Sequence, residues 1–221
     1  MANSEPETAQ LVPEHWSYQL VRELNDESLH LKSTSKSIAM RDLYPKARYH
    51  FLVLPRKNIN TLHEVMIGTL FGGFFLVRNT NLCLLQPHRL TYGWMQLTID
   101  DVALLKDMYG LAQSVIKEGG LDTKQFNFGY HLKPHMKRLH LHVISKDFDS
   151  PCLKRRHHWT IFNSDIFQSH DAVLAELKMH GKIYERPDAY IAALRNGPLK
   201  CNVCLYETDN LQTMKKHIAV H

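Results

Sequence analysis

The sequence is poor in cysteine, which excludes a disulfide-stapled fold. Four cysteines in 221 residues are too few to brace a chain of this length, and Cys83 and Cys152 stand alone. Such sparse cysteine favours a reducing, intracellular compartment. Cys201 and Cys204 differ from the other two, because their spacing is that of a metal-binding pair.

The sequence also lacks an apolar run long enough to cross a bilayer. Residues 66–77 (MIGTLFGGFFLV) number about a dozen, whereas a spanning helix needs about 20. A buried helix or a strand pair is therefore favoured over a membrane segment. The opening residues are polar and acidic, without the basic and apolar regions of a signal peptide. We expect residues 1–12 to form a disordered leader and the protein to have no membrane partner.

Neither sign of charge dominates strongly. Twenty-seven basic residues against 22 acidic ones give a formal net charge of +5. This balance suits a polyanionic partner, but a mildly basic soluble enzyme would show the same value, so composition alone leaves nucleic-acid binding open. Hydrophobic residues make up 44% of the chain, enough for one domain of ordinary size with a small appendage.

Hydrophobic periodicity predicts an α+β fold with an antiparallel sheet and flanking helices. The clearest helix covers residues 98–118, where Thr98 and Asp101 form a variant capping box and Gly119 follows the end. Its core-facing stripe is predicted to be Val102, Leu105, Met108, Leu111 and Val115. Other helices are predicted over residues 14–23 and 165–181, and strands over residues 37–42, 49–54, 126–131 and 138–145.

The end of the chain has the spacing of a Cys2His2 zinc finger. Cys201 and Cys204 are followed, after twelve residues, by His217 and His221. Two thiolates and two imidazoles fill a tetrahedral Zn²⁺ shell, so the site would be structural and would stabilise a segment too short for its own core. The alternative is a chance pairing of cysteines with a histidine-containing tail. Fingers bind nucleic acid or protein, so the motif does not decide the partner.

A histidine-rich strand is the main candidate for chemistry. Alternation over residues 138–145 predicts that Arg138, His140 and His142 share one face, while the apolar residues between them face the core. Two imidazoles and a guanidinium suit an anion, and a neutral imidazole can attack phosphorus. His131, one turn upstream, is the natural proton donor. A zinc pair and a solvated strand face are the alternatives.

These patterns resemble the histidine-triad superfamily of nucleotide hydrolases and transferases, and within it the aprataxin family. The resemblance is carried by residues 129–150 (GYHLKPHMKRLHLHVISKDFDS), 42–54 (DLYPKARYHFLVL) and 145–154 (SKDFDSPCLK), the last followed by His158 and Trp159. The finger in its terminal position is a further aprataxin feature. Residues 66–95 have no counterpart in the family pattern and form an insertion or an artefact of gene modelling.

The resemblance implies specific roles for the histidines. His140 matches the nucleophile that takes AMP as a covalent adenylyl-histidine. His142 matches the triad histidine that binds the phosphate, and His131 matches a histidine near the leaving group. Arg138 stands at the first triad position in place of a histidine, and we expect activity to survive. His135 stands where the family has a serine that contacts the phosphate.

The resemblance also implies nucleotide and DNA contacts. Asp42 matches the residue that holds the ribose hydroxyls, and Lys46 lies in the turn near the nucleotide, with Arg48 and His50 as supports. Trp16 matches an aromatic wedge against the base pair at a DNA end, the alternative being a core anchor of the first helix. A basic loop offers candidates for DNA phosphates, unless it is merely solvated: Lys154, Arg155 and Arg156. Trp159 is expected to serve packing.

Taken with this resemblance, the sequence leads us to expect a nuclear, monomeric DNA-repair deadenylase that removes AMP from 5′-adenylated DNA ends, with structural zinc and no catalytic metal. Its expected parts are a histidine-triad catalytic domain (13–183), a linker (184–198) and a Cys2His2 finger (199–221). One alternative is a general nucleoside phosphoramidate or dinucleotide hydrolase of the same superfamily. Another is a non-catalytic DNA-end-binding protein.

Overall fold

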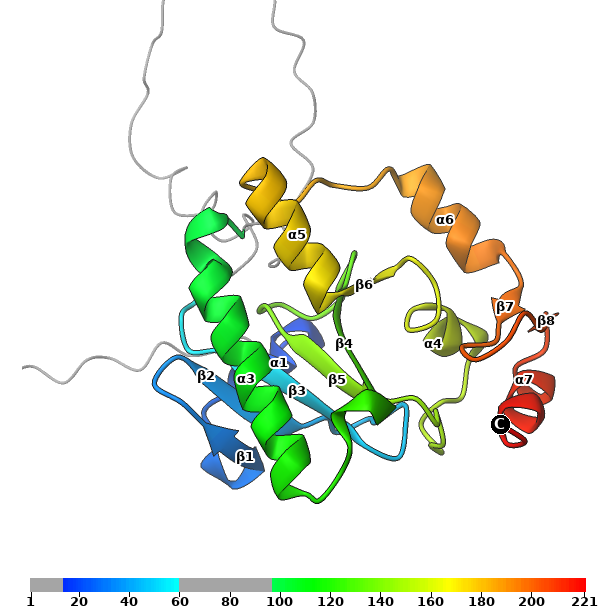
Figure 1. Cartoon of the computed structure of the whole chain (residues 1–221), viewed down its shortest axis with the longest axis horizontal. Coiled ribbons are helices and arrows are strands. Elements are labelled where there is room, and N and C mark those ends of the chain that lie inside the picture. Colours follow the sequence, from blue (N-terminus) through cyan, green and yellow to red (C-terminus); the bar gives the residue numbers. More distant parts are fainter. Residues whose placement is uncertain (1–13, 60–96) are drawn as a thin grey trace, which may run out of the picture.

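A six-stranded antiparallel sheet forms the centre of the computed structural model, which describes residues 14–59 and 97–221 (Figure 1). The strand order is β1-β2-β3-β5-β4-β6. The strands are β1 (His30–Ser33), β2 (Ser37–Arg41), β3 (His50–Pro55), β4 (Phe126–His131), β5 (Leu141–Ser145) and β6 (Phe167–Ser169). The expected leader (1–12) and insertion (66–95) lie outside the described residues.

One face of the sheet is covered by helix α3 (Val102–Glu118) and helix α5 (His170–His180), as Figure 1 shows. Phe51, Val53, Leu141 and Val143 point into this layer and pack with Leu105. Each fully buried side chain of this size contributes about 1.5–3 kcal/mol through the hydrophobic effect. The large apolar layer fixes β3 and β5 side by side, in a register that pairs Leu52 with His142.

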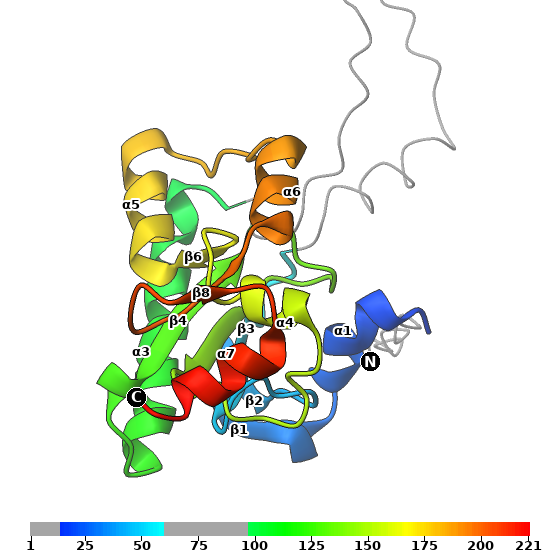
Figure 2. The same ribbon diagram turned by 90° about the vertical axis from the view of Figure 1, so that its right-hand side faces the viewer.

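Alternation sends the intervening residues to the opposite face. Met40, Leu52 and Leu54 pack there against Leu20 of helix α1 (Gln19–Glu23). The same face of β5 carries His142 and Ile144. Helix α4 (Arg156–Thr160) and the C-terminal segment cover this side near the histidines (Figure 2).

The C-terminal segment is joined to the main body by a shared core. It consists of α6 (Asp188–Asn196), β7 (Leu199–Lys200), β8 (Glu207–Thr208) and α7 (Leu211–Ile218). Leu199, Leu211 and Met214 are buried in one cluster with Trp159 and Phe162. The finger is therefore an integral part of the wall beside the histidines.

The antiparallel sheet, the long helix and the ββα finger are confirmed, and several predicted boundaries are wrong. The strand predicted over 138–145 begins only at Leu141, and the helix predicted over 165–181 begins at His170, after β6. The linker predicted over 184–198 contains α6, whose Ile191 is buried. In α3, Val102 and Val115 are only partly buried, because the stripe turns toward Ala112 and Ile116. The short β1, α4 and α6 carry too little periodicity to have been predicted.

Within the described residues, no helix is long and apolar enough to cross a membrane.

Candidate active site

His140 is held by its own main chain at the entry to β5. Its Nδ1 lies 2.8 Å from the carbonyl oxygen of Arg138. A carbonyl can only accept, so Nδ1 carries the proton and the lone pair of the imidazole resides on Nε2. Burial lowers the pKa of His140 below its ordinary value of 6.5, with smaller opposing effects from the Arg138 carbonyl and from Asp42. At neutral pH the side chain is thus an uncharged imidazole with a free Nε2 lone pair, the form that attacks phosphorus.

Arg138 supports this arrangement through its backbone. Its φ of 87° lies in the left-handed region and turns its carbonyl toward His140. Its guanidinium points toward the end of β3, where it donates to Asn58 and to the carbonyl oxygens of Pro55 (3.1 Å) and Arg56 (2.8 Å). The prediction that Arg138 projects from a strand beside the two histidines is therefore wrong, because the strand starts three residues later.

His50, expected only to support a turn, contacts the site histidines directly. The Lys46 N–H donates to His50 Nδ1 (3.1 Å), so the proton of His50 sits on Nε2. His50 Nε2 lies 3.0 Å from His142 Nδ1 and donates to it. His142 must then carry its proton on Nε2, which has no hydrogen-bond partner among the described residues. One backbone amide thus fixes the tautomers of both rings and leaves His142 with an available N–H donor.

Asp42 lies at the edge of this chain of hydrogen bonds. Its Oδ2 is 3.4 Å from His50 Nδ1, which is ion-pair distance without hydrogen-bond geometry. Burial lowers the pKa of His50 to about 4 against the opposing charge of Asp42, so His50 is neutral at pH 7 and no ion pair forms. Asp42 Oδ1 accepts the Tyr44 N–H at 2.7 Å, which holds the turn that carries Lys46.

His131 completes a cluster of rings around Phe162. The His131 ring centre lies 4.3 Å from that of His142 and 4.7 Å from that of Phe162. Phe162 also packs edge-on against His50 and His142, at 5.4 and 5.2 Å. Burial holds the pKa values of His131 and His142 well below 6.5. No local pattern pointed to Phe162, because it lies in an irregular segment far along the chain.

A small pocket opens beside these rings. It is lined by Tyr130, His131, Pro134, Arg138, Leu139 and His140. The Nε2 atom of His131, which lines the pocket, and that of the neighbouring His142 are buried and have no hydrogen-bond partner among the described residues. Buried polar atoms of this kind require a partner, and the oxygens of a bound anion would provide one. Lys46 is partly buried on the same side, and burial lowers its pKa although Asp42 opposes the effect.

The residues predicted for DNA contact fall into two groups. Trp16 is 55% exposed, so it is not the core anchor considered as its alternative, and its ring lies 6.2 Å from that of His135. Lys154 and Arg155 are exposed at the start of α4. Arg156 is used within the protein, donating to the Gly197 carbonyl and to Asp209. Arg156 thus ties α4 to the finger and is the least available of the three basic residues.

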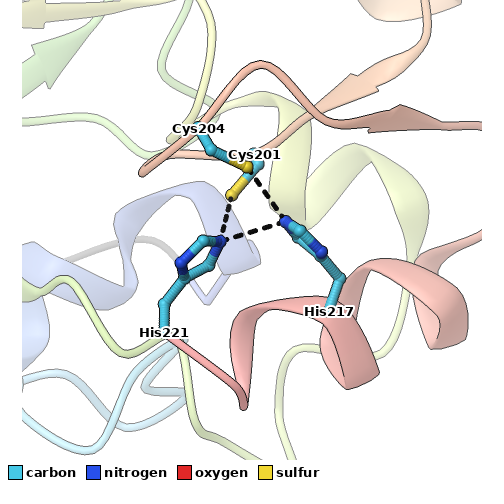
Figure 3. A group of neighbouring side chains, drawn as sticks. All are labelled: Cys201, Cys204, His217 and His221. Carbon is cyan, nitrogen blue, oxygen red and sulfur yellow. Dashed lines mark hydrogen bonds between the residues drawn. The ribbon is translucent and has the colours of Figure 1, made fainter.

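The four predicted metal ligands converge (Figure 3). Cys201 Sγ lies 3.6 Å from His221 Nε2, Cys204 Sγ lies 3.2 Å from His217 Nε2, and the two Nε2 atoms are 3.1 Å apart. Tetrahedral Zn²⁺, with bonds of about 2.3 Å to sulfur and about 2.0 Å to nitrogen, sets neighbouring ligand atoms roughly 3.2–3.8 Å apart. The residues therefore fit zinc. A second group, Asp42, His50 and His142, is also close enough to share a cation.

Comparisons with known proteins match both parts of the chain. A family model described as "Scavenger mRNA decapping enzyme C-term binding" matches residues 82–158, and one described as "C2HE / C2H2 / C2HC zinc-binding finger" matches residues 163–221. Aprataxins from Gallus gallus and Danio rerio are 30% and 32% identical over 94% of the chain. The chain is a relative of the aprataxins. It spans about half of the length of these two proteins, 55% and 54%.

Other aprataxin relatives agree with this assignment. An aprataxin-like protein of Saccharomyces cerevisiae is 28% identical, with 88% of each chain covered. A crystal structure of the aprataxin ortholog Hnt3 in complex with DNA superposes with a TM-score of 0.60, at 18% identity, covering 94% of this chain and 92% of that one. The histidine-triad fold and the Cys2His2-type finger expected from the sequence are thereby confirmed.

Proposed function

We propose that this aprataxin relative removes AMP from 5′-adenylated DNA ends, through a covalent adenylyl-histidine on His140. The observation that carries the proposal is the fixed tautomer of His140, whose uncharged Nε2 lies beside a pocket lined by a second buried histidine. The likeness to aprataxins, and to an ortholog crystallised with DNA, supports DNA as the partner.

The chemistry follows in two steps. In the first, His140 Nε2 attacks the adenylate phosphorus, an N–P bond forms, and the P–O bond to the 5′ phosphate of the DNA breaks. The DNA leaves with its 5′ phosphate, and we assign the neutral His131 as a hydrogen-bond donor to the leaving oxygen. In the second step water attacks the same phosphorus, the N–P bond breaks, the electron pair returns to Nε2, and AMP leaves, with one proton of the water kept on its phosphate and the other released to solvent.

Charge on the phosphoryl oxygens needs donors during both steps. The His142 Nε2–H is preset for this by the hydrogen bonds from Lys46 through His50, and Lys46 supplies positive charge nearby. Preorganised donors of this kind stabilise developing charge more strongly than water does. Asp42 remains the candidate for binding the ribose hydroxyls of the substrate. His135 remains the candidate for donating a hydrogen bond to a phosphate oxygen at the mouth of the histidine pocket.

The finger has a structural role in this proposal. The four ligands would hold Zn²⁺ at a closed site, which supplies fold stability and no open coordination position. Arg156 and Trp159 fix the finger against α4, the latter through a hydrogen bond from its Nε1 to the Lys200 carbonyl at 2.8 Å. We also propose nuclear residence, because the substrate is a product of abortive DNA ligation.

Single-turnover release of AMP from a 5′-adenylated nicked duplex tests the proposal, with adenosine phosphoramidate as a small adenylate in parallel. We expect the duplex to react, and Trp16→Ala to slow the duplex reaction while leaving the small adenylate unchanged. Lost stacking at one base costs about 1–3 kcal/mol. If only the small adenylate reacts, the chain is a general phosphoramidate hydrolase. If the duplex binds and neither compound reacts, the chain is a DNA-end binder.

A further inference from the structure

Helix α6 is anchored at both ends beside the mouth of the histidine pocket. Near its start, Asp188 forms an ion pair with Lys133, in the loop that also carries His135. Just past its end, the Gly197 carbonyl accepts a hydrogen bond from Arg156, the first residue of α4. Ile191 is buried in the main core. The helix is therefore held between the His135 loop and α4, with its last turn at α4.

Arg195 lies in that last turn. Its side chain is partly buried, and no hydrogen bond or ion pair joins it to any residue in the described ranges. The guanidinium donors of Arg195 are therefore left for water or for a bound ligand to satisfy. This makes Arg195 unlike Arg156, which is committed to a carbonyl and a carboxylate.

The groups around Arg195 are also basic. Besides burial, the charge of Arg195 lowers the pKa of His135, and Arg195 acts on His157 together with Arg155, His135 and Lys46. No carboxylate contributes to the environment of either histidine. His135 in turn neighbours the exposed Trp16 ring. Arg195 thus lies close enough to His135 and His157 to act on both electrostatically, on the side of the pocket that carries Trp16.

We propose that Arg195, with His135 and His157, binds a backbone phosphate of the DNA strand whose end occupies the histidine pocket. The proposal rests on the proposed function only for the identity of the polyanion. A guanidinium presents paired N–H donors that match phosphate oxygens. The phosphate would supply the missing acceptor for Arg195 and offset its charge, while His135 and His157 would donate as neutral imidazoles. Arg195 would then hold the strand between the Trp16 end and the finger, without reading its sequence.

The test measures equilibrium binding of the full chain to a nicked duplex carrying a 5′ phosphate, over a series of salt concentrations. Arg195→Gln is expected to weaken binding by about 10-fold, as for the loss of a charged hydrogen bond, and to reduce the salt slope by about one. Lys106→Gln is the matched control, because this substitution removes the same charge from an exposed position on α3, away from the histidine pocket. That variant is expected to bind nearly as wild type does.

Two further comparisons separate the possible failures. Arg195→Gln should hydrolyse the small adenylate at the wild-type rate, and Arg195→Lys should restore much of the salt slope. Equal binding by the Arg195→Gln and Lys106→Gln variants would overturn the proposed phosphate contact. It would also be overturned if Arg195→Gln lost hydrolysis of the small adenylate, because Arg195 would then have a structural role. Because binding needs no turnover, an absence of AMP release would sink the proposed function while this contact could still be observed.

Discussion

Replacing His50 probes the hydrogen-bond chain that presents the His142 proton to the phosphate. In His50→Leu, the His142 Nδ1 loses its donor, which lies at 3.0 Å in the native protein. The His142 proton then moves to Nδ1, or Nδ1 stays unpaired in a buried site. Either way, the Nε2–H is no longer fixed toward the phosphoryl oxygens.

The expected loss can be scaled from comparable sites. Removing one preorganised donor from a developing oxyanion costs about 10²–10³ in rate, or about 2.7–4 kcal/mol. An unpaired buried acceptor lowers the free energy of unfolding by about 1–3 kcal/mol. His50→Gln is the matched control, because its side-chain amide can place an N–H near the position of His50 Nε2. We expect this variant to keep its rate within about 10-fold of wild type, on the same oxyanion scale.

The assay is single-turnover release of AMP from adenosine phosphoramidate, with urea unfolding of each variant as a check that differences do not reflect loss of fold. The small substrate is chosen because it does not depend on DNA binding. A His50→Leu variant with the wild-type rate, or a His50→Gln variant as slow as His50→Leu, would refute the tautomer argument.

Three other perturbations have expected outcomes. Lowering the pH from 7 to 5.5 should reduce the free energy of unfolding, measured with urea, by about 1 kcal/mol for each buried imidazole that stays neutral. The reason is that histidines of the unfolded chain take up protons near pH 6.5, whereas these rings in the native protein do not. An unchanged free energy of unfolding would contradict the lowered pKa values. The rings concerned are His50, whose pKa is lowered to about 4, and His131 and His142, whose pKa values lie well below 6.5. Chelation of the finger metal, and equally Cys204→Ser, should slow hydrolysis of the small adenylate, because the finger packs on Trp159 and Phe162. Full activity after either change would show that the shared core does not support the active site. A loss of activity on chelation alone would point to a second metal. Gly129→Ala should lower the melting temperature in a thermal scan, since a Cβ there would lie 2.4 Å from the Gln168 carbonyl oxygen of the paired strand β6. A melting temperature equal to that of the wild type would mean that β6 shifts to make room for the added methyl group without loss of stability.

Local patterns predicted the parts of this molecule whose signals are local. The long helix follows from its capping box and apolar repeat, and the finger from the spacing of four ligands. The alternation around His142 placed its ring opposite the core, as found. These features depend on residues close together in the sequence, so no knowledge of the tertiary structure is needed.

The remaining features depend on contacts between distant segments. His50 is the second residue of the strand predicted over 49–54, but only the register of β3 against β5 brings it to His142. Arg138 looked like a strand residue, and its positive φ arises where the chain turns to bind the end of β3. Helix α6 is short, and it is held by an ion pair and a carbonyl contact from other elements. Its role beside the mouth was therefore hidden in a segment that resembled a linker.

The central claim is that His140 carries the adenylate, and trapping the intermediate tests it most directly. Wild-type protein would be mixed with a duplex bearing a 5′-adenylate labelled on its phosphorus, quenched within one turnover, and mapped by mass spectrometry. We expect one adenylyl group on His140, and neither label nor AMP release in His140→Ala. Rapid AMP release without a protein-bound adenylate, or with an unchanged rate in His140→Ala, would show that His140 is not the nucleophile.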